Sequence, residues 1–179
     1  MKELRIGDAA PNFNDLLGTD GRRYSLATFA EFPTLVLIVS CNHCPYVQAY
    51  EDRMIAIQHD YKDRGVRFVA VNSNDDKDYP EDSYESMIKR AKEKGFNFPY
   101  VRDEGQSLAR ALSAICTPEI FLFDKDRRLA YHGRIDDNRD LAKVTTHDLK
   151  NALEAMTSGR RPSVAETRPF GCSVKWRHG

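Results

Sequence analysis

The feature that most constrains the fold is an apolar segment that ends directly on a pair of cysteines. The segment Thr34–Ser40 is continuously apolar and β-rich, which predicts a strand buried on both faces. Cys41 and Cys44 follow at once. From Pro45 onward, apolar residues recur at three- and four-residue steps, which predicts one face of a helix. The cysteine pair is therefore expected where a buried strand ends and a helix begins.

The rest of the chain alternates strand and helix patterns. We expect a β-hairpin around Asp20-Gly21 and a closing hairpin formed by residues 120–124 and 128–133. Between them the sequence predicts strands at 66–72 and 98–101 and helices at 83–94 and 106–113, and a last helix follows at 146–157. This order predicts an α/β fold with a mixed central sheet, an N-terminal β-hairpin and helices on both faces. We expect one domain at 1–157 and an irregular tail at 158–179.

Composition excludes several classes of protein. The 179 residues suit a single domain. Lys plus Arg (27) balance Asp plus Glu (27), and without a basic stripe we expect no nucleic acid as a partner. No apolar run approaches the roughly 20 residues of a membrane span, and the N-terminus lacks the apolar core of a signal peptide. We therefore expect no membrane association and a cytoplasmic location, where paired cysteines indicate redox or metal chemistry.

The position of the pair favours redox chemistry. The first turn of a helix carries free N–H groups and a partial positive charge, so we expect the pKa of Cys41 to fall below its ordinary value of about 8.5. Cys44 lies one turn deeper, where it can resolve a mixed disulfide formed by Cys41. His43 is expected to favour the thiolate further and to raise the reduction potential. Asn42 and Pro45 complete the set expected to tune the pKa.

Metal binding is the main alternative for the pair. Cys-x-x-Cys is also half of a zinc site, and the missing ligands would have to come from Cys116, Cys172 or a histidine. None of these forms a second close pair, so we expect no metal. Covalent haem attachment needs His after the second cysteine, where this chain has Pro45. We expect no cofactor other than the redox-active disulfide itself.

Thr117-Pro118 precedes an apolar strand, at a position that suits either a strand-initiating proline or a cis peptide bond. With this motif the chain resembles the thioredoxin superfamily. The match is to its redoxin branch, which includes the alkyl-hydroperoxide-reductase/thiol-specific-antioxidant proteins and the cytochrome-maturation thioredoxins. The motifs that carry the resemblance are residues 6–13, 41–45 and 116–119. Bacterial redoxin-like proteins with a Gly-Cys-Ser-(Ile/Val)-Lys-Trp tail are similar as well, and here that tail is residues 171–176.

The resemblance implies a thioredoxin-like fold in which Cys41 is the nucleophile, Cys44 the resolving thiol and Pro118 a cis-proline. It also implies that the backbone at Thr117-Pro118 faces the redox pair and hydrogen-bonds the substrate chain by strand addition. Three features depart from the family pattern. Ser40 replaces a tryptophan, the strand before the pair holds no acidic residue to accept the inner thiol's proton, and position 41 is not the threonine of the peroxide-binding motif.

Two further cysteines leave alternatives open. Cys116 and Cys172 can be small buried residues or auxiliary redox groups. In the second case the tail folds back over the pair, Trp176 supplies the missing aromatic cover, and Cys172 exchanges with Cys116 or Cys41.

The leading function is thiol–disulfide exchange with protein or small-molecule disulfides, with an unidentified thiol as electron donor. The alternatives are a thiol peroxidase-like antioxidant protein, a redox-sensing module that binds a partner, and a zinc-stabilised structural domain.

Overall fold

A mixed seven-stranded sheet forms the centre of the computed structural model, which describes residues 2–179. The strands run in the order β2-β1-β5-β4-β3-β7-β8. Their bounds are Leu16–Gly18 for β1, Arg23–Tyr24 for β2, Thr34–Ser40 for β3, Val66–Asn72 for β4, Tyr100–Arg102 for β5, Glu119–Phe123 for β7 and Leu129–Gly133 for β8. The neighbours β3, β4 and β5 are parallel, whereas β1, β7 and β8 each run antiparallel to a neighbour. The expected mixed α/β architecture is confirmed.

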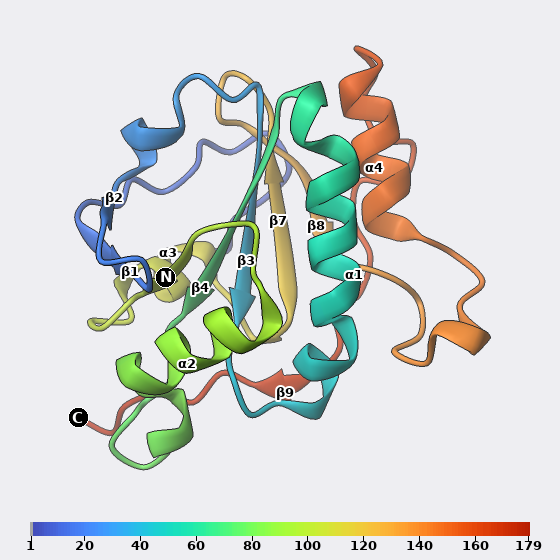
Figure 1. Cartoon of the computed structure of the whole chain (residues 1–179). Helices are drawn as coiled ribbons and strands as arrows, with labels where there is room; N and C mark the ends of the chain where they lie inside the picture. The colour runs from blue at the N-terminus through green and yellow to red at the C-terminus, as the bar shows by residue number, and fades with distance from the viewer. Residues whose placement is uncertain (1) are drawn as a thin grey trace.

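Helices cover both faces of the sheet (Figure 1). The four α-helices are α1 at Pro45–Tyr61, α2 at Tyr84–Lys94, α3 at Ser107–Leu112 and α4 at Asp148–Thr157, and short 3-10 turns lie at 26–29, 62–64, 80–82 and 141–143. Alternate residues of the central strands point to opposite faces, as in any strand. Val36 and Ile38 pack with residues of α1, α2 and α4, whereas Leu35 and Leu37 pack with residues of α3 and the N-terminal segment.

Local signals set the ends of the helices. Pro45 occupies the first turn of α1, where its missing N–H costs no hydrogen bond. Ser83 caps α2 by accepting a hydrogen bond from the Ser86 N–H at 3.2 Å, and Gly95 ends that helix in the left-handed conformation. These ends agree with the sequence patterns. The predicted starts of α3, α4 and β5 are one or two residues early.

The tail is more ordered than the sequence indicates. A second small sheet pairs β6 (Cys116–Thr117) with β9 (Cys172–Ser173) in antiparallel register, with Thr117 opposite Cys172. Figure 1 shows β9 beside the loop that enters α1. Neither strand was expected, since two-residue strands leave no alternation to detect. Among residues 2–179 no helix is both long and apolar enough to cross a bilayer.

Candidate functional site

The cysteine pair lies where β3 ends and α1 begins. Cys41 follows the last residue of β3, and Cys44 is the N-cap of α1. Both are buried, with 2% of Cys41 and none of Cys44 exposed, and all four cysteines of the chain are free thiols. The first turn of α1 therefore directs its unpaired N–H groups at Cys44, whereas Cys41 stands three residues before the cap.

Thr117 contacts both sulfurs from the opposite side. Its hydroxyl oxygen lies 3.4 Å from the Cys41 sulfur, and its carbonyl oxygen lies 3.5 Å from the Cys44 sulfur. The Thr117–Pro118 peptide bond is cis, in agreement with the resemblance. A hydroxyl can donate to a thiolate and a carbonyl can accept from a thiol. Thr117 is thus able to satisfy a charged Cys41 and a protonated Cys44 at the same time.

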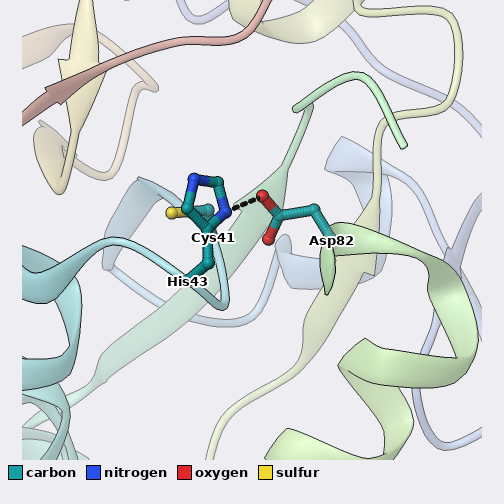
Figure 2. A group of neighbouring side chains, drawn as sticks. All are labelled: Cys41, His43 and Asp82. Atoms are coloured by element: carbon teal, nitrogen blue, oxygen red, sulfur yellow. Dashed lines mark hydrogen bonds and ion pairs between the residues drawn. The ribbon is translucent and has the colours of Figure 1, made fainter. Parts of the chain in front are cut away.

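Asp82, from the 3-10 turn before α2, is the buried acid of the site. The His43 Nδ1 lies 2.5 Å from Asp82 Oδ2, and the carboxylate is fully buried. Figure 2 shows Cys41, His43 and Asp82 converging, and one sulfur, one ring nitrogen and one carboxylate oxygen lie within 4.8 Å of one another. The ring of Tyr79 stacks on the imidazole with the two centroids 5.7 Å apart. The Asp82 carboxylate therefore lies close to the Cys41 sulfur, and His43 is hydrogen-bonded to that carboxylate.

Asn42 fixes the loop between the two cysteines. Its backbone N–H donates to Asp82 Oδ1 at 2.7 Å, and its side-chain amide donates to the Glu81 carbonyl at 2.9 Å. The Asn42 side-chain oxygen accepts from the buried Tyr100 hydroxyl at 2.7 Å. Because these groups are buried and paired, they hold the motif in one conformation. This is how Asn42 acts on the pair: it positions the loop and the acid together.

The pKa values of the two thiols diverge. The pKa of Cys41 is raised well above its ordinary value, first because its thiol hydrogen-bonds the Cys44 sulfur, then because of burial and the nearby Asp82 carboxylate. The pKa of Cys44 is lowered to about 4, first by the hydrogen bond from Cys41. Burial opposes this shift, and contacts from Cys172 and the Val47 backbone N–H add to it. Ionisation is therefore favoured at Cys44 over Cys41.

The expectation of a lowered pKa for Cys41 is therefore wrong. The helix begins at Pro45, so its N–H groups act on the cap residue Cys44 and not on Cys41. The buried acid of the site, Asp82, comes from a distant loop and lies beside Cys41, and its charge opposes ionisation of Cys41. The anion still lies at the helix start, on the other sulfur of the pair.

The cluster of Cys41, His43 and Asp82 has the donor types of a transition-metal site, so its fit to an ion can be judged from the contacts. Asp82 Oδ1 accepts from the Asn42 N–H and from the Asn72 amide, and Asp82 Oδ2 from His43 and from the Asn74 amide at 2.9 Å. Each carboxylate oxygen thus already receives two protein contacts, which fills its usual acceptor capacity. The acid therefore fits a hydrogen-bonding role, and the expectation of no metal stays a prediction.

The two remaining cysteines differ in their surroundings. Cys116 is buried, and burial followed by the Glu119 carboxylate raises its pKa to about 12. Cys172 is partly exposed and packs against the cluster that contains Cys41 and Cys44. It lies opposite Thr117 in the β6–β9 pairing, next to Cys116 in the same strand, and its charge adds to the raised pKa of Cys116. Trp176 does not cover the pair, because it is partly buried against the core on the other face of the sheet, with Arg110 4.6 Å from its ring centre. Tyr79 supplies aromatic contact instead, through His43.

Sequence reasoning missed Asp82 and Tyr79. Both lie in a polar segment that reads as a solvated loop, about forty residues after the pair, and an acidic residue there is unremarkable by composition. A faint signal was available: the segment joins the end of β4 to α2, and the ends of neighbouring parallel strands meet at the same sheet edge. That argument places the segment near the pair without choosing among its several acidic residues.

Comparison with known proteins gives consistent results. The family model described as Redoxin matches residues 5–153. A hypothetical protein from Sinorhizobium meliloti has a crystal structure that superposes with a TM-score of 0.93 at 35% identity, covering 99% of this chain and 98% of that one. An uncharacterized conserved protein from Geobacillus kaustophilus gives a TM-score of 0.93 at 37% identity, covering 99% and 95%.

A more distant structure shares the fold alone. A putative thiol:disulfide interchange protein from Chlorobium tepidum superposes with a TM-score of 0.63 at 23% identity, covering 73% of this chain and 85% of that one. No curated protein matches the sequence.

Proposed function

This chain belongs to the Redoxin family and has a thioredoxin-like fold, and from that premise we propose that it is a thiol–disulfide oxidoreductase whose redox pair is Cys41 and Cys44. The substrates are disulfides of proteins or small molecules, and the only cofactor needed is the disulfide that the two cysteines form. The observation that carries the proposal is the pair of thiols at the start of α1, both in contact with Thr117 of the cis Thr117–Pro118 unit.

The reaction begins with a proton shift within the pair. At rest the proton is on Cys41 and the charge on Cys44. When the proton moves to Cys44, the Thr117 carbonyl accepts it in a hydrogen bond and the Thr117 hydroxyl donates to the new Cys41 thiolate. The Cys41 thiolate, which is the nucleophile, thereby forms without any exchange of a proton with solvent.

Exchange then follows in two attacks. The Cys41 thiolate attacks one sulfur of the substrate disulfide, a Cys41–substrate bond forms, and the other substrate sulfur leaves as a thiolate. Cys44 next loses its proton and attacks the Cys41 sulfur, which forms the Cys41–Cys44 disulfide and releases the second substrate thiolate. The substrate gains two electrons, the pair loses two, and the leaving thiolates take up protons.

His43 and Asp82 are placed to protonate the thiolates that leave during the exchange. The imidazole is bonded to the Asp82 carboxylate and its side chain is 24% exposed, so it borders both the Cys41 sulfur and solvent. A carboxylate-bound imidazole can hold a proton and deliver it to a departing thiolate. We assign His43 the role of proton donor to the first leaving sulfur and Asp82 the role of positioning it.

A single-turnover assay tests the proposal. The reduced protein is mixed with an aromatic disulfide whose thiol product absorbs light, and the released thiol is counted. The wild type should release both substrate thiols. Cys44→Ser should release only the first and remain joined to the substrate through Cys41, whereas Cys41→Ser should release none by this route.

Two results would contradict the proposal. One is thiol release from Cys41→Ser equal to that of the wild type in rate and amount. The other is consumption of hydrogen peroxide that clearly outpaces consumption of any disulfide. The second outcome would favour a thiol peroxidase, a class disfavoured by the cysteine that replaces threonine at position 41.

A further inference from the structure

The C-terminal tail is fastened along the sheet before it reaches the redox pair. The His132 N–H donates to the Ala165 carbonyl at 3.0 Å, and the Thr167 N–H donates to the His132 carbonyl at 3.0 Å, so the tail follows the edge strand β8. It then passes the cis-proline and forms β9 against β6. The backbone edge at Thr117, where the resemblance implies that a substrate strand binds, is thus occupied by this chain's own residues.

Close contacts hold β9 on both sides of Cys172. Before it, Gly171 approaches Thr117 so closely that a Cβ on Gly171 would lie 1.9 Å from the Thr117 carbonyl oxygen. After it, the Asp75 N–H donates to the Lys175 carbonyl at 2.8 Å, and the Lys175 N–H donates to the Asn74 side-chain oxygen at 2.9 Å. Arg177 continues the attachment with an ion pair to Asp76 at 3.0 Å. Cys172 is therefore held in place by the fold.

The fixed position of Cys172 brings a third thiol close to the Cys41–Cys44 pair. Cys172 lies opposite Thr117 in the β6–β9 register, and the Thr117 carbonyl oxygen is 3.5 Å from the Cys44 sulfur. Cys172 also packs against the core cluster that contains Cys44, and it lowers the pKa of Cys44 after the larger effect of Cys41. Cys41 and Cys44 are enclosed, whereas Cys172 is partly exposed. The Cys44 sulfur therefore lies between an inner thiol and one that solvent can reach.

Building on the proposed function, we propose that Cys172 is a third redox thiol, which takes the disulfide from Cys41 by attack on Cys44 and presents it to the thiol reductant. In this step the Cys172–Cys44 bond forms and the Cys41–Cys44 bond breaks. The electron pair of the broken bond stays on the Cys41 sulfur, which takes up the proton that Cys172 gives up. No oxidant is consumed. A low-molecular-weight or protein dithiol then attacks the Cys172 sulfur, reduces the bridge and becomes a disulfide itself.

The charges around Cys172 favour its ionisation only after the Cys41–Cys44 pair has been oxidised. In the reduced protein the pKa of Cys172 is raised to about 11, first by burial, then by its hydrogen bond with Cys44 and by the Cys44 charge. Formation of the Cys41–Cys44 disulfide removes the charge of Cys44, while Lys175 and Arg139, which lower the pKa of Cys172, stay in place. Cys172 thus ionises more readily once the pair has been oxidised.

Disulfide mapping tests the proposal on the full chain. The reduced protein is oxidised with a small excess of oxidised glutathione, free thiols are blocked by alkylation, and tryptic peptides are analysed without reduction. Cys41 and Cys44 share peptide 24–53, whereas Cys116 lies in 111–125 and Cys172 in 161–175, so each bridge has its own mass. The wild type should give a link between 24–53 and 161–175 beside the internal Cys41–Cys44 bridge.

Variants separate this proposal from the proposed function. Cys41→Ser lacks the nucleophile of the exchange reaction but should still form the Cys44–Cys172 link, which places the bridge on Cys44. Cys116→Ser is the matched control and should map as the wild type. If Cys172 stays fully alkylated in the wild type and in Cys41→Ser while Cys41–Cys44 forms, Cys172 is not a relay and the proposed function stands. If the link forms without any Cys41–Cys44 bridge, the proposed function fails instead.

A rate measurement completes the test. Reduction of the oxidised protein by dithiothreitol should be slower in Cys172→Ser than in the wild type by about tenfold or more, because the enclosed Cys41–Cys44 disulfide is poorly accessible. Cys116→Ser should be reduced at the wild-type rate. Equal rates for Cys172→Ser and the wild type would show that the reductant acts directly on the inner disulfide, and would overturn the relay.

Discussion

At the scale of single residues, the chemistry of the pair depends on Asp82. This buried carboxylate accepts hydrogen bonds from the loop between the cysteines, from His43 and from two asparagines of the β4 end. It raises the pKa of Cys41 while it positions the imidazole beside the same sulfur. The residue thus restrains the nucleophile at rest and prepares the proton donor for the exchange.

We predict that Asp82→Asn makes Cys41 ionise at lower pH. The carboxylate raises the pKa of Cys41, so its removal lowers that pKa. The rate of iodoacetamide alkylation at Cys41, followed against pH in a Cys44→Ser background, measures the shift. Asp136→Asn removes another buried acid, one bonded to Arg53 and His147, and should leave the profile unchanged.

The opposite shift would also be informative. A profile that moves to higher pH in Asp82→Asn would mean that the carboxylate acts mainly by stabilising a protonated His43, which in turn favours the Cys41 thiolate. Asp82 would then favour ionisation of Cys41 instead of opposing it.

At the scale of elements, the β6–β9 pairing controls access to the site. Two short strands meet where Thr117 contacts both sulfurs, and β9 closes the backbone edge beside them. The close approach of Gly171 to Thr117 is what permits the pairing, because any side chain there would overlap the carbonyl oxygen. Opening of this pairing is the motion that would expose the pair to a large substrate.

We predict that Gly171→Ala loosens β9 and exposes Cys44. Overlap of this kind costs about 1–3 kcal/mol, and about 1.4 kcal/mol corresponds to a tenfold change in the open population. Alkylation of Cys44 in the reduced protein should therefore accelerate by about tenfold or more. Gly105→Ala, whose added methyl meets no atom within 4 Å, is the matched control. Equal alkylation rates in the two variants would show that β9 does not limit access.

At the scale of the whole molecule, the tail completes the hydrophobic core. Val174 is 4% exposed and packs with residues of β3, β4 and α3 on the face of the sheet away from α1. The segment 172–174 thus packs into the core on one face of the sheet through Val174 and pairs with β6. Through Cys172 it also packs with the cluster that contains Cys44, on the opposite face. The packing of this segment couples stability to access, because its loss would both destabilise the protein and uncover the redox site.

We predict that Val174→Ala destabilises the protein by about 1–3 kcal/mol, as expected for the loss of buried methyl groups. Val164→Ala changes another tail valine, which is 56% exposed, and should alter the free energy of unfolding by less than about 0.5 kcal/mol. Urea unfolding of the two reduced variants measures the difference. If both behaved alike, the tail would not be part of the cooperative core.

The sequence by itself determined the main architecture of this protein and the place of its thiols. The apolar run of β3, the helical periodicity after Pro45 and the Gly95 helix end are local patterns, and each of these elements forms where its pattern predicts. The cysteine pair falls at the strand–helix junction for the same reason, since it immediately follows β3 in the chain.

Only the tertiary structure decided how the site is charged and what covers it. Asp82 and Cys172 are distant from the pair in sequence, and no local pattern selects them from other acidic residues or cysteines. They reach the sulfurs because the parallel crossover brings the end of β4 beside the end of β3 and because the tail returns to β6. A pKa responds to charges within a few ångströms whatever their position in the chain, so folding alone could assign the thiolate to Cys44.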